Sequence, residues 1–183
     1  MKRLGGILLL AVGLSTAATA VEYDASVSYA RIDQNLFGTI EFPMDALVVS
    51  GTAWDDSGFG FRVTVGRSTE TANNLYVDGY HYTNKINAMY GAMVVYRQSI
   101  GNFSGEVGFG KTDYKATWTV NGKVPDWGDN SADSDWSYYA GVTYPINNDV
   151  DLSFGYTDIY RKDKEGYGRE ETRSFSAGFV YNF

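Results

Sequence analysis

Apolar and polar residues alternate with a period of two along most of the chain, which is the pattern of β-strands with two unlike faces. The last strand shows it most clearly, because Phe175, Ala177, Phe179, Tyr181 and Phe183 form one apolar, aromatic face. The positions between them are mostly small or polar, and the alternation recurs seven more times. The eight segments lie near residues 23–30, 46–54, 59–66, 88–96, 103–110, 136–144, 150–157 and 174–183. The phase of segment 46–54 stays open.

The connections between these segments alternate in length. The short ones are rich in turn residues and cover Trp54–Gly58, Gln98–Asn102 and Ile146–Asp149. The long ones are polar and lie near residues 33–45, 74–85, 119–134 and 162–170. Bacterial outer-membrane barrels have short periplasmic turns and longer outer loops. The pattern therefore predicts an all-β fold, an eight-stranded antiparallel up-and-down transmembrane β-barrel with both mature termini on the periplasmic side.

A soluble lipocalin-like barrel is the alternative, and it would place the apolar face inside. Two features favour the membrane. The second face is mostly Gly, Ser and Thr with a few charges, which makes a poor soluble core. Aromatic residues also gather near the strand ends, as in the belts that lipid interfaces select. The predicted turn-side belt is Tyr23, Trp54, Phe59, Tyr96, Phe103, Tyr144 and Phe183, and the loop-side belt is Trp118, Trp136 and Tyr160.

The first twenty residues have the features of a secretory signal peptide. Lys2 and Arg3 precede an apolar run from Leu4 to Leu14, and Ala18-Thr19-Ala20 supplies the small residues that a signal peptidase reads. A membrane-anchoring helix is the alternative, but the run is too short to span the hydrocarbon. We therefore expect residues 1–20 to be cleaved and residues 21–183 to form one barrel domain, exported to a bacterial outer membrane.

Composition agrees with a barrel and excludes several other classes. The mean hydropathy is −0.28 although aromatic residues make up 16% of the chain. A barrel explains both values, because every second residue faces a polar interior. The absence of cysteine excludes disulfides and thiolate metal sites. Of the 15 basic residues, two belong to the signal, so the mature chain has 13 basic and 22 acidic residues, a net charge of −9. This charge disfavours nucleic acid as a partner, and no cofactor is predicted.

Three features together resemble the small outer-membrane barrel family that includes the OmpA transmembrane domain and OmpX-type proteins. They are the signal ending in Ala18-Thr19-Ala20, the eight alternating segments, and the terminal sequence from Phe179 to Phe183. The resemblance covers residues 21–183. It implies that Phe179, Tyr181 and Phe183 form the C-terminal signal that the barrel-assembly machinery reads during insertion. It implies no particular activity.

Charged residues on the second face predict a network inside the barrel. Arg62 and Glu106 each lie four residues beyond a short turn, so we expect them at similar depth in the lumen. Asp24, Arg97 and Asp151 are expected near the periplasmic end. Buried charges need partners, which predicts salt bridges and hydrogen bonds among these residues. Such a network is either the gate of a narrow conduction path or a structural plug. Eight strands leave room only for side chains, which favours the plug.

The sequence gives little support to catalysis. His81 is the only histidine, and Thr83 follows it at a suggestive spacing. Some outer-membrane barrel enzymes, such as lipid A deacylases, combine a histidine with a serine and an acid. No acid is assigned here, so lipid A modification remains a remote alternative and we do not expect an enzyme.

Two outer loops carry charges that suit ligands. Oxygen ligands of the kind that Ca²⁺ prefers occur in and beside loop 119–134, at Asp126, Asp129, Asp133 and Asp135. The spacing matches no EF-hand, and a solvated acidic loop is the alternative. Basic side chains in and beside the fourth loop suit lipopolysaccharide phosphates, and a solvated mixed-charge loop is again the alternative. They are Arg161, Lys162, Lys164, Arg169 and Arg173.

Two classes of function follow from this sequence. In the first, the barrel has a structural or surface-interaction role, and its outer loops contact lipopolysaccharide, another protein, a host or a phage. In the second, it is a small porin or a narrow ion channel. The length favours the first class, because a wide aqueous pore takes about sixteen strands.

Overall fold

The structure is a computed structural model that describes residues 21–36, 40–77, 79–125, 129–131, 135–161 and 170–183. The signal peptide predicted over residues 1–20 lies outside these ranges. Within them, no helix is long and apolar enough to cross a bilayer.

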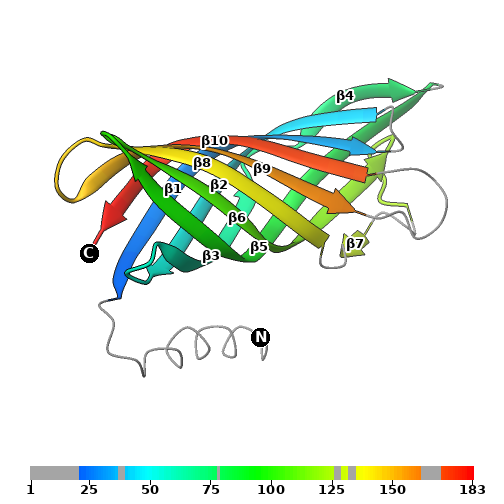
Figure 1. Cartoon of the computed structure of the whole chain (residues 1–183). Coiled ribbons are helices and arrows are strands. Elements are labelled where there is room, and N and C mark those ends of the chain that lie inside the picture. The colour runs from blue at the N-terminus through cyan, green and yellow to red at the C-terminus, as the bar shows by residue number, and fades with distance from the viewer. Residues whose placement is uncertain (1–20, 37–39, 78, 126–128, 132–134, 162–169) are drawn as a thin grey trace.

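Eight antiparallel strands close into a ring (Figure 1). They are β1 (Glu22–Leu36), β2 (Ile40–Trp54), β3 (Phe59–Ser68), β5 (Tyr80–Ile100), β6 (Phe103–Val120), β8 (Asp135–Pro145), β9 (Val150–Arg161) and β10 (Glu170–Asn182). The last strand pairs with the first, in a register that runs from Asp24 opposite Asn182 to Asn35 opposite Glu171. The predicted eight-stranded antiparallel barrel is confirmed. Two short strands, β4 (Ala72–Val77) and β7 (Asp129–Ser131), add to one end of β5 and β6.

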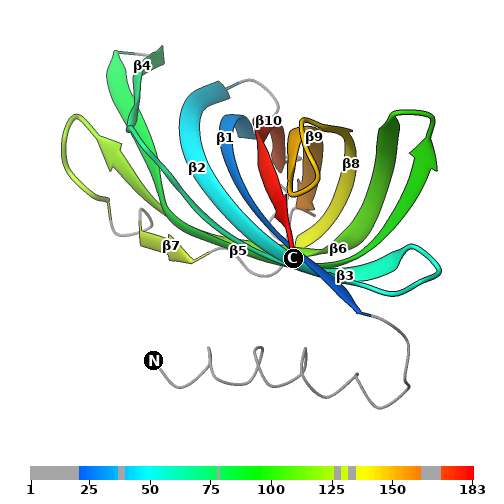
Figure 2. The same ribbon diagram turned by 90° about the vertical axis from the view of Figure 1, so that its left-hand side faces the viewer.

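The two ends of the barrel differ. The start of β1, the end of β10 and the hairpins β2–β3, β5–β6 and β8–β9 share one end, here called the turn end, which faces the viewer in Figure 2. The opposite end, the loop end, carries β4 and β7 (Figure 1). The β2–β3 turn needs glycine, because Gly58 has a φ of 86° and a Cβ there would lie 2.5 Å from the Arg97 carbonyl oxygen. The Asp55 carboxylate accepts hydrogen bonds from the backbone of Ser57 and Phe59 and stabilises the same turn.

The strands reach further than the alternation predicted. Most of segments 33–45 and 74–85 is strand rather than loop, since β1 continues to Leu36, β2 begins at Ile40, and β4 and β5 fill the second segment. β6 likewise continues to Val120, and the second short turn shrinks to Gly101 and Asn102. Near the loop end the outward residues are polar and many inward ones apolar, the reverse of the membrane part. Because the polarity of the two faces changes here, a single alternating pattern does not predict these parts of the strands.

An apolar band encircles the outside of the barrel from the turn end upward. On β1 it comprises Tyr23, Ala25, Val27 and Tyr29, and Arg31 ends it. Five other strands also present four apolar or glycine residues outward and then a charged one. The residues that end the band on the six strands are Arg31, Asp45, Arg67, Lys111, Asp158 and Arg173. Val107 and Phe179 in this band are 57% and 56% exposed, as a lipid-facing wall requires. We call the apolar part the lipid band and the charged ring the collar.

The aromatic belts correspond in part to the prediction. Large exposed rings lie outward at the turn end, and Tyr96 packs against Phe59 with ring centroids 5.0 Å apart. Trp136 and Tyr160 are exposed on the loop side. The placement of Trp54 and Trp118 in these belts was wrong, because both face the lumen and are 1% and 6% exposed. The even-numbered residues of β2 and β6 point inward, and the phase of β2 could not be read from its sequence.

Candidate functional site

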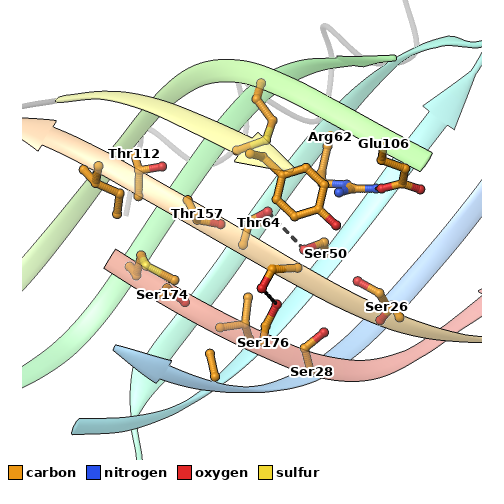
Figure 3. Close-up of a pocket in the computed structure, with 18 of the residues that line it drawn as sticks. Ser26, Ser28, Ser50, Arg62, Thr64, Glu106, Thr112, Thr157, Ser174 and Ser176 are labelled. Atoms are coloured by element: carbon orange, nitrogen blue, oxygen red, sulfur yellow. Dashed lines mark hydrogen bonds and ion pairs between the residues drawn. The ribbon is translucent and has the colours of Figure 1, made fainter. Parts of the chain in front are cut away.

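The lumen contains a buried ion pair between Arg62 on β3 and Glu106 on β6, the two strands that flank β5. Arg62 Nη2 donates to Glu106 Oε2 at 2.7 Å, and Arg62 Nε donates to Thr52 Oγ1 at 3.0 Å. Both charged side chains are at least nine-tenths buried. Figure 3 shows the guanidinium reaching across to the carboxylate. The two residues expected at equal depth are thus brought into direct contact.

Tyr139 on β8 completes this layer. Its ring centroid lies 4.8 Å from the Arg62 guanidinium carbon, which is a cation–π distance. The ring fits because two neighbours lack side chains: a Cβ at Gly141 would lie 2.1 Å from the Tyr139 hydroxyl, and one at Gly155 would lie 2.8 Å from Cε2. Sequence reasoning missed Tyr139. The available signal was one large aromatic on the lumen face of β8, in phase with a glycine.

A second layer closes the turn end around Trp54. The indole Nε1 donates to Asp24 Oδ2 at 2.5 Å. The Arg97 guanidinium lies 4.5 Å from the indole centroid, and Arg97 Nη2 donates to Glu22 Oε2 at 2.7 Å. Trp54 therefore links Asp24 and Arg97. Sequence reasoning had not assigned Trp54 or Glu22 to the network.

Asp151 adjoins the Trp54 layer through Asn182, which lies opposite Asp24 in the register of β1 and β10. Its Oδ2 accepts a hydrogen bond from Asn182 Nδ2 at 3.3 Å. Trp54 connects four of the five residues expected in one network, because the Arg62 guanidinium carbon also lies 5.9 Å from its ring centroid. The fifth, Asp151, is bonded to Asn182.

Beyond the Arg62–Glu106 pair lies a cavity of about 80 Å³. Serine and threonine hydroxyls from β1, β2, β3, β9 and β10 line much of its wall (Figure 3). Two of them, Ser50 and Thr64, are hydrogen-bonded at 3.0 Å. A water molecule needs about 10–15 Å³ of such volume and two to four polar partners, so the cavity has room and partners for a few waters.

The loop half of the lumen is packed with apolar side chains. The larger buried members of this cluster are Ile32, Phe42, Met44, Ile86, Met89, Tyr114, Trp118 and Ile159. Phe42 and Trp118 meet edge to face at 4.7 Å. Gln34 Nε2 donates to the Tyr114 hydroxyl at 3.0 Å, and Asn84 Nδ2 donates to Gln34 Oε1. The expectation of a small, polar inner face is wrong for this half, because most of these residues lie outside the predicted strand segments, and Phe42 and Met44 lie in a segment assigned to a loop.

The remaining candidates lie toward the loop end or outside the described ranges. Thr83 Oγ1 is hydrogen-bonded to Thr119 Oγ1 at 2.7 Å, and the His81 backbone nitrogen donates to Asn121 Oδ1. No group of three His, Cys, Asp or Glu side chains in that part of the chain could hold a metal ion. Asp126, Asp133, Lys162, Lys164 and Arg169 lie outside it. Side chains of Asp129, Asp135 and Arg161 are not described, and Arg173 Nη2 donates to Glu171 Oε2 at 2.7 Å.

The C-terminal aromatic residues lie on the outward face of β10. Phe179, Tyr181 and Phe183 are 56%, 47% and 76% exposed. The backbone nitrogen of Phe183 donates to the Tyr23 carbonyl oxygen at 2.9 Å, which extends the pairing with β1 to the end of the chain.

Comparison with known proteins gives structural matches only. No family model matches the chain, and no curated protein matches it in sequence. Neisserial surface protein A (NspA) is similar in structure, with a TM-score of 0.64, 16% identity, and coverage of 88% of this chain and 97% of that chain. The attachment invasion locus protein Ail of Yersinia pestis is also similar, with a TM-score of 0.59, 15% identity, and coverage of 88% of this chain and 98% of that chain. A second Ail structure, in complex with the heparin analogue sucrose octasulfate, has a TM-score of 0.58 and 15% identity, and the match covers 89% of this chain and 99% of that chain.

At these identities the similarity establishes the fold and nothing finer. Both proteins match over nearly their whole length, and the ring of eight antiparallel strands is common to all three. By its fold, this chain is therefore a small eight-stranded β-barrel of the outer-membrane type.

Proposed function

We propose that the chain is an integral outer-membrane β-barrel with a closed lumen, and that its loop end is a surface for interaction. One observation carries the proposal: the lumen is filled at separate levels. Trp54 and the Arg62–Glu106 pair occupy the turn half, and the apolar cluster around Phe42 and Trp118 occupies the loop half. Between them lies a cavity of about 80 Å³. A barrel filled in this way supports surface binding better than conduction.

The part of the barrel beyond the collar is suited to contact with other molecules. Its strands continue past the lipid band with polar residues such as Asp33, Glu41 and Lys115 outward. Its interior is packed like that of a soluble protein, so the strands have a firm support. Ail, a barrel of the same fold, was solved with a heparin analogue bound. That complex supports, by analogy, a surface-binding role for this chain.

The proposal includes the route to the membrane. Residues 1–20 would direct export, and Phe179, Tyr181 and Phe183 on the exposed face of β10 would be read by the barrel-assembly machinery. Both mature termini would lie in the periplasm, at the turn end. Fractionation of cells that express the full chain, followed by N-terminal sequencing, should place the protein in the outer membrane with a new terminus at Val21.

A flux measurement tests the closed lumen. The purified chain, reconstituted into liposomes, should release no more sugar or salt than empty liposomes, while a sixteen-stranded porin releases both. Heat-modifiable migration in gels confirms that the reconstituted barrel is folded. Reproducible solute flux through the folded chain would establish the alternative function, a small porin.

A further inference from the structure

Four basic side chains gather on the outer wall formed by β3, β5 and β6. These are Arg67, Lys85, Lys111 and Lys115, all exposed, and we call them the basic patch. On adjacent strands, Lys115 lies opposite Ala88 and Lys85 lies opposite Thr117. Arg67 follows Gly66, which pairs with Met89, so Arg67 adjoins Ala88 from the other side. Arg67, Lys85 and Lys115 therefore occupy neighbouring positions on one face. Lys111 lies on the same face of β6, four residues from Lys115, with Asp113 between them.

The charge beyond the lipid band is distributed unevenly around the barrel. The outward side chains described beyond the band on β3, β5 and β6 include these four cations and one acid, Asp113. On β1, β2, β9 and β10 the described outward cations are Arg31 and Arg173, and the acids are Asp33, Glu41, Asp45, Asp158 and Glu171. Glu70 follows Thr69, whose backbone nitrogen donates to the Asp45 carbonyl oxygen, so it lies at the β2 edge of the patch, three residues beyond Arg67. One further acidic position, Asp129 of β7, lies opposite Thr117 in the backbone register.

One cation of the basic patch, Lys111, lies directly above aromatic residues of the lipid band. Lys111 follows Phe109 by two positions, so both point outward on β6. Lys111 Nζ lies 5.0 Å from the Trp136 ring centroid, and Trp136 stacks on Phe109 with centroids 4.7 Å apart. Cations above an apolar, aromatic wall match a lipid whose phosphates lie above its acyl chains. Cationic side chains at a membrane surface bind such phosphates by charge.

We propose that the basic patch binds the phosphates of one lipopolysaccharide molecule in the outer leaflet, with its acyl chains against Phe109, Tyr90 and Tyr138. This inference rests on the outer-membrane location proposed above. It differs from the sequence-based expectation, which assigned lipopolysaccharide contact to the fourth loop. The proposed site lies on β3, β5 and β6, across the barrel from the fourth loop, on the wall where described outward cations outnumber acids.

A pair of matched triple variants tests the site. The first, K85Q/K111Q/K115Q, removes three cations of the basic patch, and the second, R31Q/K123Q/R173Q, removes three exposed cations elsewhere. The full chain is refolded without lipid in zwitterionic micelles and titrated calorimetrically with bisphosphorylated lipid A. The patch variant should bind about ten- to a hundredfold more weakly than wild type, and the control variant should bind within about threefold of it. Wild type should bind dephosphorylated lipid A as weakly as the patch variant binds the phosphorylated form.

Other results would overturn the site. Equal losses in both variants would show a general charge effect, and equal binding of dephosphorylated lipid A would show that the phosphates are not recognised. A patch variant that loses binding to sucrose octasulfate but keeps lipid A would show that the cations serve a soluble glycan instead. Each of these failures leaves the closed, membrane-inserted barrel intact. Recovery of the chain outside the outer membrane would instead contradict the proposed function itself.

Discussion

Arg62 and Glu106 form a 2.7 Å ion pair across the inner face of β5, linking two strands that do not touch each other along the wall. The pair is a cross-brace inside the barrel, and Tyr139 covers it from β8. Its energetic role follows from its burial. A buried charge left without its partner is costly, whereas an apolar pair of similar volume is often tolerated.

Breaking the brace on one side should destabilise the barrel strongly. Arg62→Met leaves Glu106 buried and unpaired, and should lower the free energy of unfolding by about 3–5 kcal/mol. The double variant R62M/E106L should recover most of this loss. Urea unfolding in lipid vesicles, followed by tryptophan fluorescence, measures both. Arg173→Met, which removes an exposed ion pair with Glu171, is the control and should cost no more than about 1 kcal/mol. Equal effects at the two sites would contradict a bracing role.

The same pair should not act as the gate of a pore. Glu106→Ala removes the carboxylate but leaves the apolar cluster of Phe42, Ile86 and Trp118 in place at the loop half. Planar-bilayer recordings of E106A should therefore show no stable, ion-selective openings, as for wild type. If E106A conducts and wild type does not, the pair is a gate and the apolar cluster is permeable.

Trp54 should stabilise the barrel more through its hydrogen bond than through its ring alone. Trp54→Phe keeps an aromatic ring beside Arg97 but removes the donor to Asp24, a carboxylate that is 6% exposed. Leaving a buried acceptor unsatisfied should cost about 1–3 kcal/mol of unfolding free energy. Trp136→Phe on the outward side of β8 is the matched control and should cost less, since Trp136 is 49% exposed and phenylalanine keeps the ring that stacks on Phe109. Denaturation curves of the two variants decide the comparison.

The edge of the lipid band can be located with one substitution made at two heights on β6. Val107→Arg lies within the band and should destabilise the barrel by about 2–4 kcal/mol in vesicles, whereas Thr117→Arg lies beyond the collar and should cost about 1 kcal/mol or less. Both positions face outward on the same strand. In detergent-free vesicles, equal costs would mean that the collar does not mark the membrane boundary.

The β2–β3 turn should give the barrel a pH-dependent contribution. Hydrogen bonds from Ser57 and from the backbone of Phe59 and its neighbours hold the pKa of Asp55 below the ordinary value of an aspartate, about 3.8. Because the pKa is lower in the folded state, the stabilising effect is present above the unfolded pKa and fades as the pH falls through the folded value. Asp55→Asn should therefore be less stable than wild type at pH 7, and the difference should shrink below pH 3.8. A difference that is constant down to acid pH would contradict this.

The sequence predicted the turn half of the barrel well because one pattern governs it: apolar residues point outward and small or polar residues point inward. Where β10 faces lipid, Phe175 to Phe183 alternate without interruption, and strand count and closure follow from such repeats. The loop half follows another rule, with apolar residues inside. Phe42 and Met44 were therefore assigned to a loop, and Trp118 to an aromatic belt, whereas the structure shows all three facing inward.

The sequence predicted which charged residues face the lumen, but it did not predict most of the contacts that they make there. Equal distance from two short turns was enough to bring Arg62 and Glu106 to the same depth. The partner of Asp24 could not be found in this way, because it depended on the phase of β2, which is hidden by Ala53, Gly51 and other small residues. Tyr139 was missed for a related reason, since its place depends on space left by glycines on two strands.

The lipid band also has a consequence for the thickness of bilayer that suits the protein. Four outward residues cover seven positions on each of six strands, and a tilted strand rises about 3.3 Å per residue along its own axis. At a tilt of about 40°, the band spans on the order of 15–20 Å of hydrocarbon. That is short even for bacterial outer membranes, which are thinner than average. The barrel should therefore thin the bilayer around it and insert fastest into lipids with short acyl chains.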